Sequence, residues 1–213
     1  MTSDVNLSRM GEPNDHRPAV TLALVLVDLQ RDFCPGGALA VPAGNDVIPV
    51  LNAVARQAQK HRAVLYASRD WHPAESRHFV SSGGSWPTHC VAGTPGAKFH
   101  QALQLPRSTG IVDKGVDPDS DGYSVFDGTL RDGTGLLDDL QRQSIHHLII
   151  GGLATDYCVR HSVLDARHHG FQVTVLTDGI AAVDLAPGDG TRALDEMRRA
   201  GAILQVSTSL TWS

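Results

Sequence analysis

The chain has 213 residues, of which 41% are hydrophobic and 19% charged, a balance that predicts one globular domain with a sizeable core. The formal net charge of −5, without a Lys/Arg cluster, excludes an obvious nucleic-acid surface, and no apolar stretch is long enough to span a bilayer. The three cysteines cannot all pair within the chain, which favours a reducing compartment, the cytoplasm, and a reactive or metal-linked thiol.

The chain-order pattern begins with a polar segment and continues with alternating strands and helices. We expect residues 1–19 to be a disordered tail and residues 20–213 to form one domain. Short apolar runs predict six strands, at residues 21–27, 63–67, 111–112, 147–150, 172–176 and 203–206. Helical periodicity predicts four helices, at residues 47–60, 135–143, 155–169 and 191–200. This alternation predicts a three-layer, doubly wound α/β fold, with a mainly parallel six-stranded sheet and helices on both faces.

A pair of glycines and then a cysteine follow the fourth predicted strand. Gly151 and Gly152 lead into a polar turn, where Thr155 as N-cap would place Cys158 in the first turn of the next helix. There the helix dipole and the unpaired N–H groups favour a thiolate over a thiol. Backbone N–H groups of Ala154, Thr155 and Cys158 could form an oxyanion hole.

Three more reactive side chains, Asp28, Asp70 and Lys114, also fall just after predicted strands. The carboxyl ends of parallel strands share one edge of a sheet, so these residues can converge there. Asp28 as base and Lys114 as cation would support Cys158 in acyl transfer from an amide, with Asp28 passing the thiol proton to the leaving ammonia. Each residue alone has a plainer interpretation, as packing, turn or solvated surface, but their coincidence favours catalysis.

A second candidate cluster contains Asp70, His72, His78 and His89. Aspartate and histidine side chains in one loop region can bind a divalent ion through mixed nitrogen and oxygen ligands. The Asp-x-His spacing alone is only moderately specific, because many of the 11 histidines are expected to be plain surface residues. The placement of His89 on a loop near the same sheet edge strengthens the case for a metal site.

In their joint order and spacing, several segments resemble the nicotinamidase branch of the isochorismatase-like cysteine hydrolases. The resemblance runs from about residue 20 to the C-terminus. The matching segments are residues 27–39, 68–73, 85–91, 114–115, 123–126 and 151–159.

The resemblance implies a role for each candidate residue. It implies a catalytic triad of Asp28, Lys114 and Cys158. It implies one divalent ion, Zn, Fe or Mn, that anchors a pyridine nitrogen and is bound by Asp70, His72 and His89, with His78 or water completing the site. It further implies that the ring is held by aromatic side chains and that the turn contains a cis peptide bond. The residues concerned are Phe33, Trp86 and Tyr123 for the ring, and the bond between Ala154 and Thr155.

The activity implied by the resemblance is hydrolysis of nicotinamide to nicotinate and ammonia through a cysteine thioester, in NAD salvage, with pyrazinamide as a second substrate. Other members of the superfamily, such as N-carbamoylsarcosine and ureidoacrylate amidases, remain alternatives, although they generally lack the Asp70, His72 and His89 set. A non-catalytic metal-binding relative is a third. We expect a small-molecule substrate, no nucleic-acid or membrane partner, and leave open a homo-oligomer.

Overall fold

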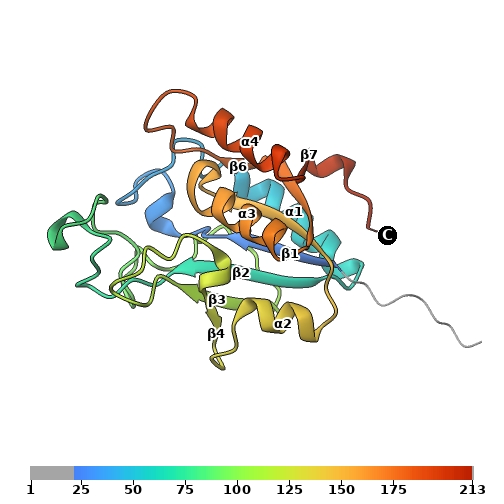
Figure 1. Ribbon diagram of the computed structural model, residues 1–213, viewed down its shortest axis with the longest axis horizontal. Helices are drawn as coiled ribbons and strands as arrows, with labels where there is room; N and C mark the ends of the chain where they lie inside the picture. Colours follow the sequence, from blue (N-terminus) through green and yellow to red (C-terminus); the bar gives the residue numbers. More distant parts are fainter. Residues whose placement is uncertain (1–21, 213) are drawn as a thin grey trace, which may run out of the picture.

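A seven-stranded sheet, parallel except at one edge, forms the centre of the molecule (Figure 1). The computed structural model describes residues 22–212, so the tail expected at residues 1–19 lies outside the described residues. The strand order is β4-β3-β2-β1-β5-β6-β7. The strands are β1 Leu22–Val27, β2 Val64–Asp70, β3 Gly110–Lys114, β4 Thr129–Leu130, β5 His147–Leu153, β6 Gln172–Ala181 and β7 Ile203–Gln205.

The doubly wound α/β class is confirmed, but the sheet has one strand more than the six predicted. The additional strand, β4, pairs antiparallel with β3 at the edge of the sheet. A strand of two residues shows no periodicity, which is why the apolar pattern did not reveal it. Strands β2 and β5 also run beyond their apolar cores, because Asp70 still pairs with Lys114 of β3, and Gly152 with Val27 of β1.

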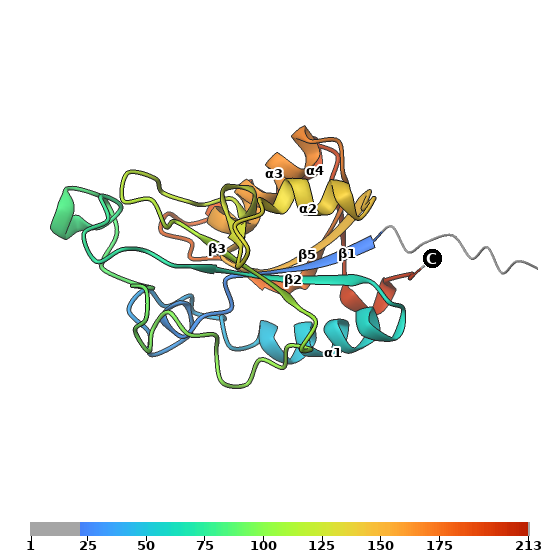
Figure 2. The ribbon, with the colours of Figure 1, turned by 90° about the horizontal axis from the view of Figure 1, so that it is seen from below.

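Helices cover both faces of the sheet, as Figure 2 shows edge-on: α1 lies on one side, and α2, α3 and α4 lie on the other. The helices are α1 Val47–Lys60, α2 Leu136–Arg142, α3 Arg160–His168 and α4 Asp189–Arg199, with short 3₁₀ turns at Arg31–Phe33, Val80–Ser82, Val125–Asp127 and Ser207–Ser209. The predicted helix at 155–169 is divided into a π-helical turn, η4 Thr155–Val159, and α3. Within residues 22–212, no helix has the length and apolar content needed to span a membrane.

The residues of β1 alternate between the two hydrophobic cores. Leu24 and Leu26 pack in the core that includes α1, while Val25 and Val27 pack in the core beneath α2, α3 and α4. Every residue of β1 is therefore buried, which explains its uninterrupted apolar sequence.

The chain first builds the sheet outward from β1 through β2, β3 and β4, and then returns to the other side of β1 to add β5, β6 and β7. The topological switch point of the sheet therefore lies between β1 and β5. Ligand crevices form at such points, beyond the carboxyl ends of the strands. Gly152 allows these two ends to approach each other, because its φ is +134° and a Cβ there would lie 2.1 Å from the Val27 carbonyl oxygen. Asp28 is thereby placed beside the turn that follows β5.

Candidate active site

The ammonium of Lys114, which is fully buried at the end of β3, lies at the centre of the candidate site. Its Nζ is 2.9 Å from Asp28 Oδ2 and 3.4 Å from Cys158 Sγ. It also donates to the Gly122 carbonyl at 2.9 Å and pairs with Asp70 Oδ1. Burial alone would lower the pKa of Lys114, but Asp28 and Asp70 outweigh burial and raise this pKa well above its ordinary value. Lys114 is therefore a permanent cation in contact with the thiol.

Asp28 follows β1 and is held in a left-handed backbone conformation with φ of +49°. Ser68 Oγ donates to Asp28 Oδ1 at 2.8 Å, and Lys114 faces the other carboxylate oxygen. Burial raises the pKa of Asp28 to about 6, against the attraction of Lys114. A carboxylate with a pKa so close to neutrality can both accept and return a proton during a reaction.

Cys158 lies in η4, within 4.8 Å of an Asp28 carboxylate oxygen, but it is not the low-pKa thiolate that its position predicted. Burial raises the pKa of the Cys158 thiol well above its ordinary value; Lys114 opposes this, while Asp28 and Asp70 reinforce it. The expectation was wrong because it counted the helix dipole and neglected desolvation by the surrounding protein. Burial thus favours the protonated thiol at Cys158, and Asp28 is the neighbouring group that could accept its proton.

The turn that carries Cys158 begins one residue earlier than expected. The cis peptide bond joins Leu153 to Ala154, not Ala154 to Thr155, and the N-cap is Ala154, not Thr155. The reason is that β5 continues through Leu153, so the change of direction comes immediately after it. The Ala154 carbonyl accepts the N–H groups of Tyr157 and Val159, both at 3.1 Å. The N–H groups of Ala154, Thr155 and Cys158, which we expect to form an oxyanion hole, belong to this turn and its N-cap, as the thiol does.

Asp70 connects the triad to a cluster of three buried histidines. The candidate ligand atoms of His72, His78 and His89 all lie within 4.8 Å of one another. Asp70 Oδ2 is 3.5 Å from His72 Nε2 and 3.9 Å from His89 Nε2, while Asp70 Oδ1 faces Lys114. Burial alone would raise the pKa of Asp70, but Lys114 and His72 outweigh it and keep this pKa below its ordinary value. The structure therefore brings together all four predicted metal ligands.

The histidines present the lone pairs that a divalent metal ion requires. In each of the three rings Nδ1 is hydrogen-bonded to an oxygen, which leaves Nε2 as the free nitrogen. The oxygens are Gly115 O at 3.0 Å for His72, Asp121 Oδ1 at 2.7 Å for His78 and Pro87 O at 2.8 Å for His89. Among the described atoms, the buried Nε2 of His72 has no hydrogen-bond partner. Burial lowers the pKa of His78, and lowers that of His89 to about 4. With His78 and His89 held neutral, imidazole nitrogens beside a carboxylate fit such an ion.

A largely apolar pocket lies between Cys158 and the histidine cluster. The three residues predicted to hold a ring, Phe33, Trp86 and Tyr123, all line it. Trp86 Nε1 donates to Tyr123 Oη at 2.8 Å, which fixes the two side chains against each other. Other residues of its lining are Leu39, Asp70, His78, His89, Ala154, Tyr157, Cys158 and Val183.

The sequence interpretation missed Tyr157 as a wall of this pocket. Its ring packs edge-on against Trp86, with centroids 4.8 Å apart. Its position directly before Cys158, in the turn that follows β5, was the available signal. Leu39 and Val183 were missed as well: Leu39 is the last residue of the matching segment 27–39 and was given no role, and Val183 lies in no matching segment.

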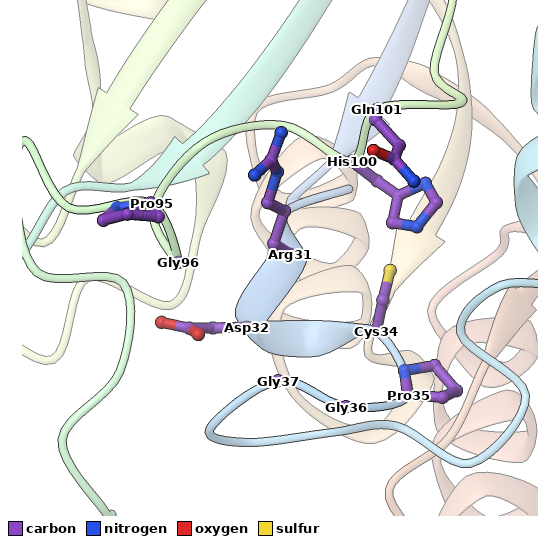
Figure 3. Close-up of a pocket in the computed structure, with 10 residues that line it drawn as sticks. All are labelled: Arg31, Asp32, Cys34, Pro35, Gly36, Gly37, Pro95, Gly96, His100 and Gln101. Carbon is purple, nitrogen blue, oxygen red and sulfur yellow. The ribbon is translucent and has the colours of Figure 1, made fainter.

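A second opening, shown in Figure 3, lies beside the 3₁₀ turn Arg31–Phe33. Its lining includes His100 but none of Asp28, Lys114 and Cys158 and none of the three clustered histidines. Its Asp32 carboxylate is used structurally, since it accepts the Cys90 N–H at 2.7 Å and the Ala38 N–H at 3.3 Å. Cys34 is buried there, and burial raises its pKa to about 11. The opening is a junction of loops, and the candidate chemistry is elsewhere.

Comparison with known proteins assigns the family. A sequence model of the isochorismatase domain matches residues 22–209. The chain belongs to the isochorismatase family. Within this family, the nicotinamidase of Escherichia coli (strain K12) is 42% identical over 198 residues, which cover 85% of this chain and 93% of that protein.

Solved structures of isochorismatase-family proteins share the fold. Pyrazinamidase of Pyrococcus horikoshii in complex with zinc has a TM-score of 0.80 and 42% identity, over 87% of this chain and 99% of that one. PnC1 from L. infantum in complex with nicotinate has a TM-score of 0.79 and 34% identity, over 91% and 96% of the two chains.

Proposed function

We propose that this protein hydrolyses nicotinamide to nicotinate and ammonia, with Cys158 as the nucleophile and pyrazinamide as a second substrate. The observation that carries the proposal is the set of contacts made by Lys114. This single buried ammonium contacts the thiol of Cys158, the candidate base Asp28 and the carboxylate of Asp70, which lies beside the histidine cluster. The similarity to the E. coli nicotinamidase and to the nicotinate-bound PnC1 supports the same substrate.

In the first half of the reaction, Asp28 removes the thiol proton as Cys158 Sγ attacks the amide carbon. The carbonyl electron pair moves to oxygen, where backbone N–H groups of Ala154, Thr155 and Cys158 stabilise the negative charge. The tetrahedral intermediate then collapses. The C–N bond breaks, Asp28 delivers its proton to the leaving nitrogen, and ammonia departs from a thioester.

In the second half, water replaces ammonia. Asp28 accepts a proton from the water as the oxygen attacks the thioester carbon, and the C–S bond breaks to give nicotinic acid, which loses its remaining proton to solvent and leaves as nicotinate. The sulfur then regains a proton through Asp28. Lys114 stays charged throughout and balances the negative charge that passes between Asp28 and Cys158.

The remaining residues hold the ring. Phe33, Trp86 and Tyr123 offer flat apolar surfaces to a pyridine. Asp70, His72, His89 and His78 would hold a Zn, Fe or Mn ion, whose chemistry when bound is to anchor the ring nitrogen and so position the amide. Residues 20–213 would act as one hydrolase domain, and the three free thiols favour the cytoplasm.

The decisive experiment measures ammonia release from nicotinamide in parallel with N-carbamoylsarcosine and ureidoacrylate. We expect nicotinamide to be preferred, and Cys158→Ala to lower kcat/KM by at least about 10³-fold, because Cys158 carries the only thiol among the described residues that line the pocket. Circular dichroism and bound metal should be unchanged in this variant. Cys34→Ala is the matched control, since Cys34 is also a buried thiol but does not line the candidate pocket.

Two outcomes would contradict the proposal. Wild-type activity in Cys158→Ala would exclude the thiol mechanism. A clear preference for the carbamoyl or ureido substrate would exclude nicotinamide as the principal substrate.

A further inference from the structure

The acidic segment between β3 and Tyr123 contains three aspartates, and they make different contacts. Asp117 Oδ1 accepts the Asp119 N–H at 2.9 Å, and Asp119 pairs at 3.0 Å with Arg77, whose side chain is exposed. Asp121 instead reaches inward, where its Oδ1 lies 2.7 Å from His78 Nδ1. The Asp121 side chain is 63% exposed, whereas that of His78 is 4% exposed. A surface carboxylate is thus bonded to a buried candidate ligand.

The residues that follow Asp121 contact the other two parts of the site. The carbonyl of Gly122 accepts a hydrogen bond from Lys114 Nζ, and Tyr123 Oη accepts one from Trp86 Nε1. Three consecutive residues therefore support the histidine cluster, the triad and the ring pocket in turn. Asp121 is the residue of this segment that contacts the cluster, and the hydrogen bonds of Gly122 and Tyr123 hold the backbone next to it.

Asp121 also differs from the groups that support the other two histidines. His72 and His89 donate to backbone carbonyls, which are neutral. His78 is the one described ring of the cluster whose Nδ1 faces a carboxylate. A carboxylate hydrogen-bonded to one imidazole nitrogen fixes the tautomer and orientation of the ring, and it makes the other nitrogen a stronger ligand for a metal ion.

We propose that Asp121 is a positioning residue of the metal centre, which holds His78 with Nε2 toward the cluster and makes it the fourth protein ligand of the ion. This inference rests on the metal site proposed above and does not depend on the substrate. Without this partner, His78 would lose the hydrogen bond that fixes its tautomer and ring orientation, and water would take its place beside the ion.

The test measures Zn²⁺ binding to chelator-stripped protein by competition with a chromophoric chelator. Asp121→Ala is expected to raise the Zn²⁺ Kd by about 10–100-fold, and Asp121→Asn by less, because an amide oxygen still accepts from His78. The matched control is Asp119→Asn, which removes the same charge from the same segment, where the Asp119 carboxylate pairs with Arg77 and not with a histidine of the cluster. Its Kd should equal that of the wild type.

Cobalt spectroscopy gives a second readout that a merely structural role would not move. The visible bands of Co²⁺-loaded Asp121→Ala should shift in the same way as those of His78→Ala, because both lose the same ligand. An unchanged Kd and unchanged bands in Asp121→Ala would overturn the inference, as would equal weakening by Asp119→Asn. Wild-type protein that binds neither ion would remove the metal centre itself, while leaving nicotinamide hydrolysis to be judged by its own assay.

Discussion

At the scale of the residue, the site consists of a few buried groups of opposite charge in direct contact. One ammonium, Lys114, faces two carboxylates and a thiol, and none of the four is exposed to solvent. A buried cation in this setting requires partners on several sides, because desolvation would otherwise outweigh its interactions. The arrangement leaves Asp28 able to change its protonation state, while Asp70 stays ionised.

The pH dependence of the reaction should report Asp28. With a pKa of about 6, Asp28 is a carboxylate above that pH and accepts the thiol proton; below it, Asp28 is protonated and cannot. We therefore expect kcat/KM for nicotinamide to be level above about pH 7 and to fall about tenfold per pH unit below 6. Steady-state kinetics with metal content measured at each pH provide the test, and a level profile down to pH 5 at constant metal would contradict it.

Most site residues were predictable individually, but their electrostatics were not. Asp28, Asp70, Lys114 and Cys158 each follow an apolar run, so the topology of a parallel sheet suffices to bring them to one edge. The pKa of Cys158 depends on how deeply its turn is buried, which no local pattern encodes. The partnership of Asp121 with His78 was hidden because the two residues are 43 positions apart in segments without periodicity.

At the scale of the element, the close approach of β1 and β5 places Asp28 beside the turn that carries Cys158. The helix at residues 47–60 was predicted with its observed bounds because its apolar face is regular. The ends of β2 and β5 were underestimated, because polar residues and glycines there continue the strand pairing after the hydrophobic signal stops.

Gly152→Ala should be strongly destabilising. Its Cβ would lie 2.1 Å from the Val27 carbonyl oxygen, and this oxygen belongs to a central strand that cannot move aside. We expect a loss of more than about 3 kcal/mol in the free energy of unfolding, measured with urea. Gly170→Ala is the control, because Gly170 also has a positive φ, +87°, but has open space around it. Its cost should be about 1 kcal/mol, and equal losses in the two variants would show that the approach of the strands is not the cause.

At the scale of the whole molecule, metal binding should add to the stability of the fold. An ion that binds only the folded state stabilises it by about 2.7 kcal/mol at a concentration 100-fold above its Kd. For a chain of this size, we expect Zn²⁺ to raise the Tm of chelator-stripped protein by about 5–10 °C. His72→Ala should lose this shift, and the exposed His168→Ala should keep it. A shift of equal size in His72→Ala would place the stabilising ion elsewhere.

The two parts of the site differ in how far apart their residues lie along the chain. All four candidate metal ligands fall between residues 70 and 89, whereas Asp28, Lys114 and Cys158 come from the ends of β1, β3 and the turn after β5. Closing a short segment costs less chain entropy than joining distant strands. The candidate ligand cluster can therefore tolerate changes at the outer strands β6 and β7, but Cys158 and Asp28 meet only when the middle of the sheet is assembled. A damaged sheet would thus lose hydrolysis before it loses its affinity for metal.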